Sequence, residues 1–512
     1  MKYLVGIDIG TTGAKCGIMD TQGNLIASAY REYTCEYPQP NWVEQDVDMI
    51  VRKAFEAAKE ALAASDIELS SIASISASTQ RTCSIFLDEN GDALKMISWQ
   101  DNRTSAQVKD IEENFGSEKY YNITGIPLNT TWILTKILWV RENLPQLWEK
   151  TKKVVQLQDF FLKKLGADNY YIDIPDAVLY GMWDNDNFKW SDDIMDAFSI
   201  SKSLLPVPTR CGTKVGTLGK QSAQELGLEA GIPVCVGAGD QNAAAIGAGV
   251  VEKGLVSVSI GTGGMAIAMM DHRFKDPERI TCMGNHAIYG KWQIEGYQSG
   301  SAGVLRWIRD NIADLEKNQA QESGSDVYVK INEMISEVPA GAKGLLFLPF
   351  LASAAAPRWN PEARGTLIGL TFAHDKRHLA RAYMEGITLE QKDILNSISK
   401  VAGNIDLVRI MGGAAKSELW CQMQADMYRT EVQTLKVSDA AIVGACILAG
   451  VGVGIFDDIK QGVAKMVVPD KRYQPKEENM NVYEGLYKIY CNAYEALNIS
   501  KVYEQISMFQ KS

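Results

Sequence analysis

Hydrophobic and polar positions along the first part of the chain predict three short strands followed by a helix. Apolar stretches are separated by the sequence Gly-Thr-Thr-Gly and then by a polar, glycine-containing segment that is typical of a hairpin turn. The predicted strands lie at residues 3–9, 15–19 and 25–29. After a capping residue at Asp46 or Asp48, apolar residues recur at the spacing of a helix. They are Ile50, Ala54, Phe55, Ala58, Ala61 and Leu62.

The second half of the chain begins with the same pattern. Apolar residues alternate with serines at 256–260, a glycine and threonine turn follows, and a further strand is predicted at 265–270. Two such units, about 250 residues apart, predict an α/β fold of two similar domains that face one another across a cleft. We expect the domains to cover residues 1–250 and 251–512.

A strand, a glycine turn and a helix are predicted later in the second half. Residues 407–411 are apolar and precede Gly412-Gly413-Ala414-Ala415, and Ser417 stands where the next helix begins. In that helix Leu419, Met423 and Met427 lie on one face. A glycine turn between a buried strand and a helix leaves room for a ligand beside the backbone.

Composition and charge narrow the classes of function. The chain has 512 residues, of which 46% are hydrophobic and 22% charged, as expected for a folded protein with more than one domain. The net charge of −11 disfavours partners such as nucleic acids or an anionic membrane surface. Nine scattered cysteines and an N-terminus without a secretion signal predict a cytoplasmic protein. The uncharged run 440–456 contains four glycines, and we interpret it as a buried helix and turn.

The two glycine and threonine turns are candidate phosphate-binding sites. In Asp8-Ile9-Gly10-Thr11-Thr12-Gly13, the glycines allow close approach to a ligand, and N–H groups and hydroxyls can hydrogen-bond phosphate oxygens. Gly261-Thr262-Gly263-Gly264 offers the same groups from the second domain. Each turn alone is typical of a simple hairpin. Their equivalent positions favour a shared role in gripping one nucleotide, with Asp8 holding Mg²⁺ directly or through water.

A carboxylate follows another apolar strand. Gly237-Ala238-Gly239-Asp240-Gln241-Asn242 comes directly after the strand predicted at 233–236, and the glycines leave room for a substrate. Asp240 could therefore accept a proton from a hydroxyl group that attacks a phosphate. The alternative interpretation is that Asp240 caps the alanine-rich helix that follows it.

Four motifs, taken together in this order, resemble the FGGY carbohydrate kinases. They are Asp8-Ile9-Gly10-Thr11-Thr12, Gly239-Asp240-Gln241-Asn242-Ala243-Ala244, Ser259-Ile260-Gly261-Thr262-Gly263 and Gly412-Gly413-Ala414-Ala415-Lys416-Ser417. The resemblance extends from residue 1 to about residue 460. Two family signatures are also present, each with one departure, at Ile133 and at Tyr383. The resemblance implies two actin-like, ribonuclease H-like domains that flank a central cleft, and an ATP-dependent kinase.

The resemblance also implies roles for individual residues. Asp240 would be the catalytic base, and Asp8 would hold Mg²⁺. The nucleotide would be bound by Gly10, Thr11, Thr12, Lys15, Gly261, Thr262, Gly263, Gly412, Gly413 and Ser417. Closure of the domains over the bound sugar would exclude water and limit wasteful hydrolysis of ATP.

Substrate contacts are expected from the first domain. The candidates are Gln80, Arg81, Trp99, Asp101, Trp132, Asp240 and Gln241. Polar side chains beside an aromatic wall suit a polyol or a ketose, since each buried hydroxyl group needs a hydrogen-bond partner. For Trp99 and Trp132, ordinary packing in the core is the alternative interpretation.

The identity of the sugar is left open. Glycerol kinases carry a carboxylate after Gln-Arg, where this chain has Thr82, so glycerol is disfavoured. Xylulokinases usually carry Gln-Met-His there, and Gln80-Arg81-Thr82 departs from that pattern as well, so a ketopentose such as xylulose is only the default expectation. The alternatives are a kinase for another polyol, ketose, sugar acid or signalling molecule of the autoinducer-2 type. The phosphorylated hydroxyl group, any regulation and the assembly, including a homodimer, also stay open.

A different class of function is an actin-like protein that binds ATP without acting on a sugar, such as a chaperone, a filament protein or a sugar-binding repressor. A repressor would need a DNA-binding arm, yet the chain starts directly on its first strand. A chaperone would need a substrate domain after the second actin-like domain, where few residues follow. These features favour the enzyme.

Overall fold

The computed structural model of the protein describes residues 1–261 and 263–511. The chain forms two compact units, each assembled from separate segments of sequence. Unit 1 consists of Met1–Val251, Met269–Gln293 and Asp439–Val468. Unit 2 consists of Glu252–Ala268, Ile294–Ser438 and the described residues from Pro469 onward.

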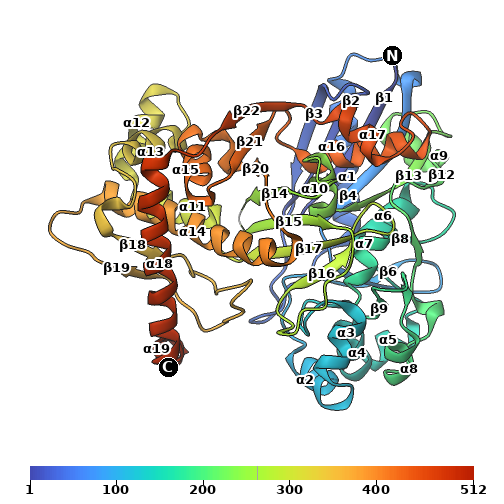
Figure 1. The fold of residues 1–512 in the computed structure, drawn as a ribbon. Helices are drawn as coiled ribbons and strands as arrows, with labels where there is room; N and C mark the ends of the chain where they lie inside the picture. The colour runs from blue at the N-terminus through green and yellow to red at the C-terminus, as the bar shows by residue number, and fades with distance from the viewer. Residues whose placement is uncertain (262, 512) are drawn as a thin grey trace. The chain divides into compact units, whose positions relative to one another are not determined.

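Unit 1 is built on a six-stranded mixed sheet with the order β12-β13-β4-β1-β2-β3 (Figure 1). Its strands are β1 (Tyr3–Ile9), β2 (Gly13–Asp20), β3 (Leu25–Glu32), β4 (Ile72–Thr79), β12 (Lys214–Thr217) and β13 (Pro233–Gly239). β1, β2 and β3 are antiparallel neighbours, whereas β4 runs parallel to β1 and to β13. The C-terminal ends of β1, β4 and β13 therefore lie at the same edge of the sheet.

Some helices of unit 1 cover the sheet, and others pack with short strands beside it. They are α1 (Val47–Ala63), α2 (Ser105–Asn114), α3 (Ser117–Thr124), α4 (Ile133–Asn143), α5 (Pro145–Lys150), α6 (Leu157–Leu165), α7 (Ile174–Val178), α8 (Asp192–Ala197), α9 (Lys220–Leu226), α10 (Asp240–Gly247), α16 (Ala440–Gly452) and α17 (Ile459–Met466). The short strands are β5 (Ser84–Leu87), β6 (Ala93–Ile97), β7 (Lys153–Val155), β8 (Tyr171–Asp173), β9 (Trp183–Asp184), β10 (Lys189–Trp190) and β11 (Val207–Thr209). β6, β5 and β7 form a small sheet beside an aromatic-rich core that includes α4.

Both faces of the central sheet are covered by helices. Val5 and Ile7 of β1 lie in a core that α1 and α6 complete. On the opposite face, a Cβ atom at Gly6 would lie 2.9 Å from Sγ of Cys446 in α16. β1 is therefore apolar at almost every position, because neither of its faces meets solvent.

Unit 2 contains a seven-stranded sheet with the order β16-β17-β15-β14-β20-β21-β22. Its strands are β14 (Leu255–Ile260), β15 (Gly264–Met270), β16 (Cys282–Asn285), β17 (Trp292–Gln298), β20 (Leu407–Gly412), β21 (Glu431–Leu435) and β22 (Pro469–Tyr473), with β16 and the ends of β15 and β17 assigned to unit 1. A separate pair is formed by β18 (Leu346–Leu348) and β19 (Thr366–Ile368). The helices are α11 (Ala302–Asn311), α12 (Asp314–Ser323), α13 (Val327–Ser336), α14 (Lys376–Ala402), α15 (Glu418–Tyr428), α18 (Glu477–Ile499) and α19 (Val502–Lys511).

The two central sheets repeat one topology. In unit 1, β1 pairs antiparallel with β2 and parallel with β4, and in unit 2, β14 pairs antiparallel with β15 and parallel with β20. A further parallel strand follows in each case, β13 in unit 1 and β21 in unit 2. This confirms the predicted α/β fold with two ribonuclease H-like, actin-like cores.

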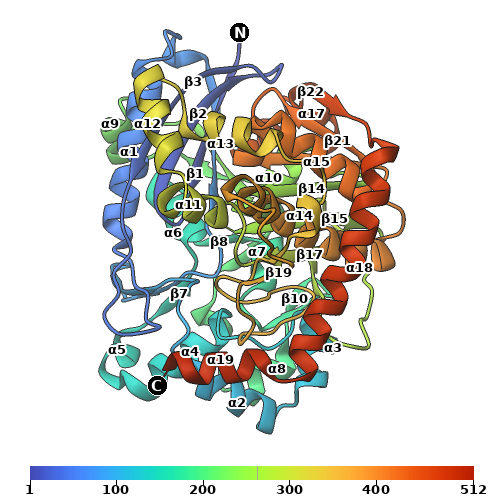
Figure 2. The ribbon, with the colours of Figure 1, turned by 90° about the vertical axis from the view of Figure 1, so that its left-hand side faces the viewer.

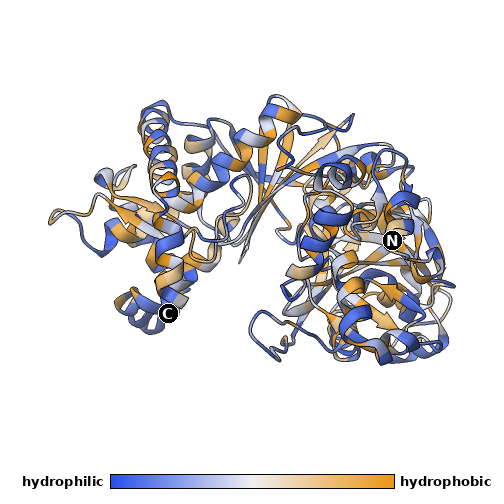
Figure 3. Cartoon of the chain, turned by 90° about the horizontal axis from the view of Figure 1, so that it is seen from below, coloured by the Kyte–Doolittle hydropathy of each residue, from blue (hydrophilic) through white to orange (hydrophobic). Residues whose placement is uncertain are grey.

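The distribution of hydrophobic and hydrophilic residues follows this architecture. Figure 3 shows hydrophobic residues along the strands and a mixture of hydrophobic and hydrophilic residues along many helices, as expected for sheets covered by amphipathic helices. Figure 2 shows α18 and α19 as the two successive helices that end the described chain. The amphipathic α18 turns buried tyrosines inward within unit 2, where Tyr483 bonds to Glu385 and Tyr490 lies against Phe350.

The local expectations agree with the structure at several element boundaries. Asp46 is the cap of α1, since its side chain accepts hydrogen bonds from the amides of Asp48 and Met49 at 3.0 Å each. The uncharged run beginning at Ala440 forms the buried helix α16. Across the described residues, no helix has the length and apolar character needed to span a membrane.

Candidate active site

The turn between β1 and β2 is held in place by side chains from other parts of unit 1. Nε2 of Gln45 donates to the carbonyl of Thr11 at 2.9 Å, and Nε1 of Trp99 donates to the hydroxyl of Thr11 at 2.9 Å. The indole of Trp99 therefore reaches this turn and does not serve only as core packing. The expected phosphate contacts at Gly10, Thr11 and Thr12 stay predictions on a turn whose central residue is anchored on two sides.

Asp8 lies just before this turn in a group of charged residues. It pairs with Lys15 across the antiparallel β1–β2 register, and the hydroxyl of Ser78 donates to its Oδ1 at 2.8 Å. Burial raises the pKa of Asp8 to about 7 against the lowering effect of the Ser78 hydrogen bond, and the carboxylates of Asp240 and Asp439 raise it further. Nζ of Lys15 lies 2.7 Å from Oδ2 of Asp439. Charges that are distant in sequence thus gather at the end of β1.

The donor atoms at this end of β1 fit Mg²⁺, which is held by hard oxygen ligands. No group of three histidine, cysteine, aspartate or glutamate side chains is arranged for a metal ion in the part of the chain that the structure describes. Mg²⁺ in nucleotide sites commonly takes only one or two protein carboxylates, together with phosphate oxygens and water. Asp8, with Asp240 near it, suits that mode of binding.

Asp240 is placed at the point where β13 ends and α10 begins. Gly239 occupies the N-cap position, so Asp240 is the first helical residue and not the cap. Its Oδ1 accepts the amide of Gln241 at 2.7 Å and lies 3.5 Å from Nε of Arg81. The side chain is 29% exposed and can therefore meet a ligand. Helix N-terminus and guanidinium both stabilise the carboxylate anion, which is the form a general base needs.

Gly239 allows two side chains, those of Asp176 and Arg81, to approach the backbone behind Asp240. A Cβ atom at Gly239 would lie 2.3 Å from Oδ1 of Asp176 and 2.6 Å from Cγ of Arg81. Asp176 is fully buried, and neither of its carboxylate oxygens has a hydrogen-bond partner among the described residues. Burial and the neighbouring Asp173 hold the pKa of Asp176 well above its ordinary value, while Arg81 opposes this. Any side chain at position 239 would displace Asp176 or Arg81.

Gln80 and Trp132 are both buried, but only Gln80 belongs to the network around the turn. The amide of Gln80 donates to the carbonyl of Ile9 at 2.7 Å, and its Nε2 donates to Oε1 of Gln45 at 3.1 Å. Trp132 donates from Nε1 to the carbonyl of Pro127 at 2.6 Å and precedes α4. Direct sugar contacts for both residues stay predictions.

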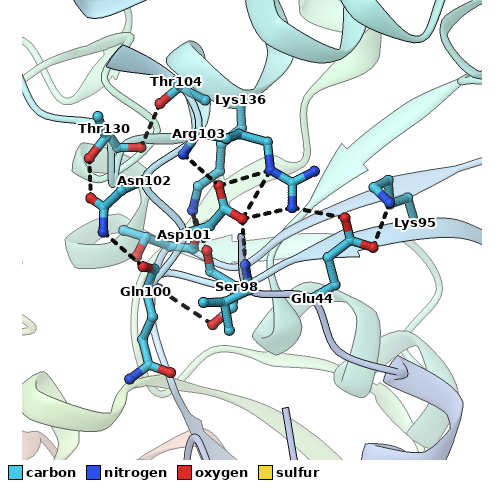
Figure 4. A network of polar contacts seen from close by, with 12 residues as sticks. Glu44, Lys95, Ser98, Gln100, Asp101, Asn102, Arg103, Thr104, Thr130 and Lys136 are labelled. Carbon is cyan, nitrogen blue, oxygen red and sulfur yellow. Dashed lines mark hydrogen bonds and ion pairs between the residues drawn. The ribbon is translucent and has the colours of Figure 1, made fainter. Parts of the chain in front are cut away.

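Asp101 lies in a polar network that uses both of its carboxylate oxygens (Figure 4). It accepts the amide of Val43 at 2.6 Å and the amide of Arg103 at 3.0 Å. The guanidinium of Arg103 donates to both oxygens of Asp101 at 2.7–3.0 Å, and also to Glu44 at 2.8 Å. Asp101 is completely buried. These bonds give Asp101 a structural role, and its direct contact with a sugar stays a prediction.

In unit 2, the glycine turn lies beside the start of a helix. The amide of Gly261 donates to the carbonyl of Gly263 at 2.9 Å, and the amide of Ala302 in α11 donates to the carbonyl of Gly261 at 2.8 Å. Thr262, the expected phosphate contact in this turn, lies outside the described residues. Nucleotide contacts from Gly261 and Gly263 stay predictions.

The second glycine turn of unit 2 joins β20 to α15. Gly412 has a left-handed φ of 77°, and a Cβ atom there would lie 2.6 Å from the carbonyl oxygen of Ile260. At Gly413 the same carbonyl would be 3.9 Å away, which is ordinary contact. The hydroxyl of Ser417 accepts the amide of Trp420 at 3.2 Å, so Ser417 caps α15 as expected from the sequence.

Several residues of these sites were missed by reasoning from the sequence. In unit 2, the hydroxyl of Ser301 at the start of α11 is buried with no hydrogen-bond partner among the described residues. Below the first turn, Nε2 of Gln298 donates to Glu390 at 2.8 Å, and a Cβ atom at Gly264 would lie 2.7 Å from Oε1 of Gln298. A Gly-Ser pair directly before an amphipathic helix is the signal that could have pointed to Ser301.

Unit 1 also contains residues that the sequence did not single out. Lys136, Asp176 and Asp439 all lie close to the predicted site residues but come from three distant parts of the chain. Only Lys136 had a local signal, because it stands in one of the two family signatures. Asp176 and Asp439 have none.

The chain has two ribonuclease H-like cores, a glycine and threonine turn after β1, and a partly exposed carboxylate at the start of α10. Together these features are typical of actin-like kinases that act on small molecules. The N-terminal domain of the FGGY family of carbohydrate kinases matches residues 3–247, and the C-terminal domain of that family matches residues 256–453. The chain therefore belongs to the FGGY family of carbohydrate kinases, and it is an ATP-dependent sugar kinase.

Similar proteins in other organisms agree with this assignment. A gluconokinase of Bacillus licheniformis is 30% identical over 524 residues, which cover 100% of this chain and 99% of the relative. A xylulose kinase of Staphylococcus epidermidis is 29% identical and covers 96% of this chain and 97% of the relative. The structure of a ligand-bound xylulose kinase from Lactobacillus acidophilus shares the fold, with a TM-score of 0.89, 24% identity and coverage of 99% and 100%.

Proposed function

We propose that this kinase phosphorylates a hydroxyl group of a neutral ketose, with a ketopentose such as xylulose as the first candidate and Asp240 as the general base. The observation that carries the proposal is the placement of Asp240, which is 29% exposed at the start of α10 and 3.5 Å from Arg81. The relatives do not separate the substrates, since a gluconokinase and a xylulose kinase are about equally similar to this chain.

The charges around Asp240 favour a neutral sugar over a sugar acid. Two cations of this region already face carboxylates, since Lys15 lies 2.7 Å from Asp439 and Arg81 lies 3.5 Å from Asp240. Asp8 adds another acidic group at the end of β1. The carboxylate of an aldonate would be repelled by these acids and would have to displace an existing ion pair. A neutral ketose needs only hydroxyl hydrogen bonds.

The residue after Arg81 argues against glycerol. Thr82 has a left-handed φ of 59°, its amide donates to Gln156 at 2.7 Å, and its hydroxyl donates to the carbonyl of Arg81 at 2.7 Å. Because residue 82 is a threonine, this position lacks the carboxylate that glycerol kinases are expected to have there.

In the proposed reaction, the oxygen of a sugar hydroxyl forms a bond to the γ-phosphorus of ATP as the bond to ADP breaks. Asp240 accepts the proton that this hydroxyl group loses. Arg81 holds the Asp240 carboxylate and donates to Asn242 at 3.3 Å, which keeps the base in a fixed orientation. Mg²⁺, held by Asp8, would neutralise charge on the phosphates.

The test is ADP release by the purified protein with Mg-ATP and a panel of pentuloses, hexuloses, polyols, glycerol and aldonates. We expect the largest stimulation from a neutral ketose, and a loss of kcat of about 100-fold or more in Asp240→Asn with ATP binding retained. Stimulation mainly by gluconate would overturn the neutral-substrate proposal. Full activity of Asp240→Asn would overturn its role as the base.

A further inference from the structure

Lys136 is a fully buried lysine in α4, and among the described residues its ammonium group donates hydrogen bonds only to backbone oxygens. Its relative exposure is 0%. Nζ donates to the carbonyl of Thr82 at 2.9 Å and to the carbonyl of Ser98 at 2.8 Å. Figure 4 shows Lys136 reaching into the network from α4 toward Ser98.

The two carbonyls belong to the two segments that carry the proposed sugar contacts. Thr82 directly follows Arg81 and has the left-handed φ of 59°. Ser98 directly precedes Trp99, whose indole donates to the hydroxyl of Thr11 in the β1–β2 turn. The ammonium group of Lys136 therefore joins two loops. One carries Arg81, which lies beside Asp240, and the other carries Trp99, which contacts the β1–β2 turn.

Packing alone does not explain a lysine at this position. Burial lowers the pKa of Lys136 to about 8, because a charged ammonium loses its hydration inside the protein. Cys83 and Asp101 favour the charge, and Arg103 opposes it. The carboxylate of Asp101 is already bonded to Arg103 and makes no hydrogen bond to Lys136. An apolar side chain would fill the same space in the aromatic-rich core without this penalty.

We propose that Lys136 is a positioning residue for the sugar. By holding the carbonyls of Thr82 and Ser98, it fixes the direction in which Arg81 and Trp99 leave their loops. It does not touch the reacting atoms. This inference rests on the proposed location of the sugar site in unit 1.

The experiment compares two buried lysines of the same chain. Lys392 in α14 of unit 2 is 6% exposed, and its Nζ donates to the carbonyl of Met427 at 2.8 Å. Lys136→Met and Lys392→Met each remove a buried ammonium. Lys136→Met takes a donor from the carbonyls of Thr82 and Ser98, of which Ser98 still accepts the amide of Asp101 at 3.2 Å. Lys392→Met takes the donor from the carbonyl of Met427 and also removes an ion pair with Glu484 at 3.6 Å. We expect the sugar KM to rise about tenfold in Lys136→Met only, with the KM for ATP unchanged in both variants.

Sugar affinity measured by calorimetry without nucleotide should weaken in parallel with the change in KM. Lys136→Gln keeps an N–H donor without a charge, so it should retain more sugar affinity than Lys136→Met. It also carries the test if the Met variant does not fold. An unchanged sugar KM in a folded Lys136 variant would overturn the inference, as would an equal rise in Lys392→Met.

A fourth variant separates this inference from the proposed sugar site. Arg81→Ala removes a proposed sugar contact itself. If Arg81→Ala weakens sugar binding and Lys136→Met does not, the positioning role is wrong and the site stands. If Arg81→Ala leaves sugar binding unchanged, the proposed site is wrong, and the positioning role falls with it.

Discussion

The turns that open the two central sheets are built alike but carry different chemistry. In unit 1, Asp8 lies two residues before Gly10 and faces Lys15 across the hairpin. In unit 2, Ser259 lies two residues before Gly261 and faces Met265. The same position is thus charged in unit 1 and neutral in unit 2. A shared backbone fixes where a phosphate could approach, whereas the residue before the turn decides whether a cation can be held there.

The central parallel strands of the two units differ in the same way. β4 of unit 1 leads into Gln80, whose side chain donates to Gln45 beside the β1–β2 turn, and into Arg81, whose side chain lies beside Asp240. β20 of unit 2 leads into Gly412 and Gly413, which have no side chains. Side chains suit the recognition of separate hydroxyl groups, and bare backbone suits a flat ring or a phosphate. This difference supports our proposal that the sugar and the base belong to unit 1, and the expectation that Gly412 and Gly413 of unit 2 contact the nucleotide.

The largest effect is expected when the turn of unit 1 is made to resemble that of unit 2. Asp8→Ser should lower kcat by about 100-fold or more, because the carboxylate proposed to hold Mg²⁺ is lost. The activity should be measured over a range of Mg²⁺ concentrations, and the variant should need more Mg²⁺. Ser259→Ala at the equivalent position of unit 2 is the matched control and should change little. Equal losses in both variants would show that the two turns do not differ in function.

A smaller effect is expected from the glycine turn of unit 2. Gly412→Ala forces a left-handed alanine whose Cβ atom would lie 2.6 Å from the carbonyl oxygen of Ile260. We expect a loss of about 1–3 kcal/mol in the free energy of unfolding and a higher KM for ATP. Thermal melting and ATP titration would check both values. Gly413→Ala, which has room for the methyl group, should melt close to the wild type, and a larger drop there would contradict the steric argument.

The smallest effect concerns a buried acid below the first turn of unit 2. Burial raises the pKa of Glu390 from 4.5 to about 8. Between these values the folded protein keeps the proton and the unfolded chain does not, so this residue makes folding stability fall as the pH rises from about 4.5 to about 8. Glu390→Gln cannot ionise, and its melting temperature should fall less over that range. If the melting temperatures of Glu390→Gln and the wild type changed by the same amount from pH 5 to pH 8.5, the prediction would be wrong.

Much of the fold follows from local patterns. The alternation of apolar residues and the glycine turns predicted β1, β2, β14 and β15, because a strand buried on one or both faces leaves a clear trace in sequence. The cap at Ser417 was also predicted, and the cap at Asp46 was one of two candidates beside Asp48, since capping depends on neighbours only two or three residues away. The family motifs placed Asp8 and Asp240 in one domain, and these lie near each other in unit 1.

Contacts between distant segments were not visible in the sequence. Asp439 follows Lys15 by 424 residues, yet the two form an ion pair, because the buried helix α16 returns to the sheet of unit 1. The uncharged run 440–456 had indicated only that this helix is buried, and not which sheet covers it. The apolar character of a helix indicates that the helix is buried, but it does not indicate which element the helix packs against.

The sequence by itself determined the repeated α/β core, the two glycine turns and the candidate base. Only the tertiary structure decided what surrounds that base: Arg81 at its side, Asp176 behind Gly239, and Lys136 between the loops of Thr82 and Ser98. The physical reason is that motifs arise from short-range backbone geometry. The charge and position of a catalytic group depend instead on side chains that folding brings together from far along the chain.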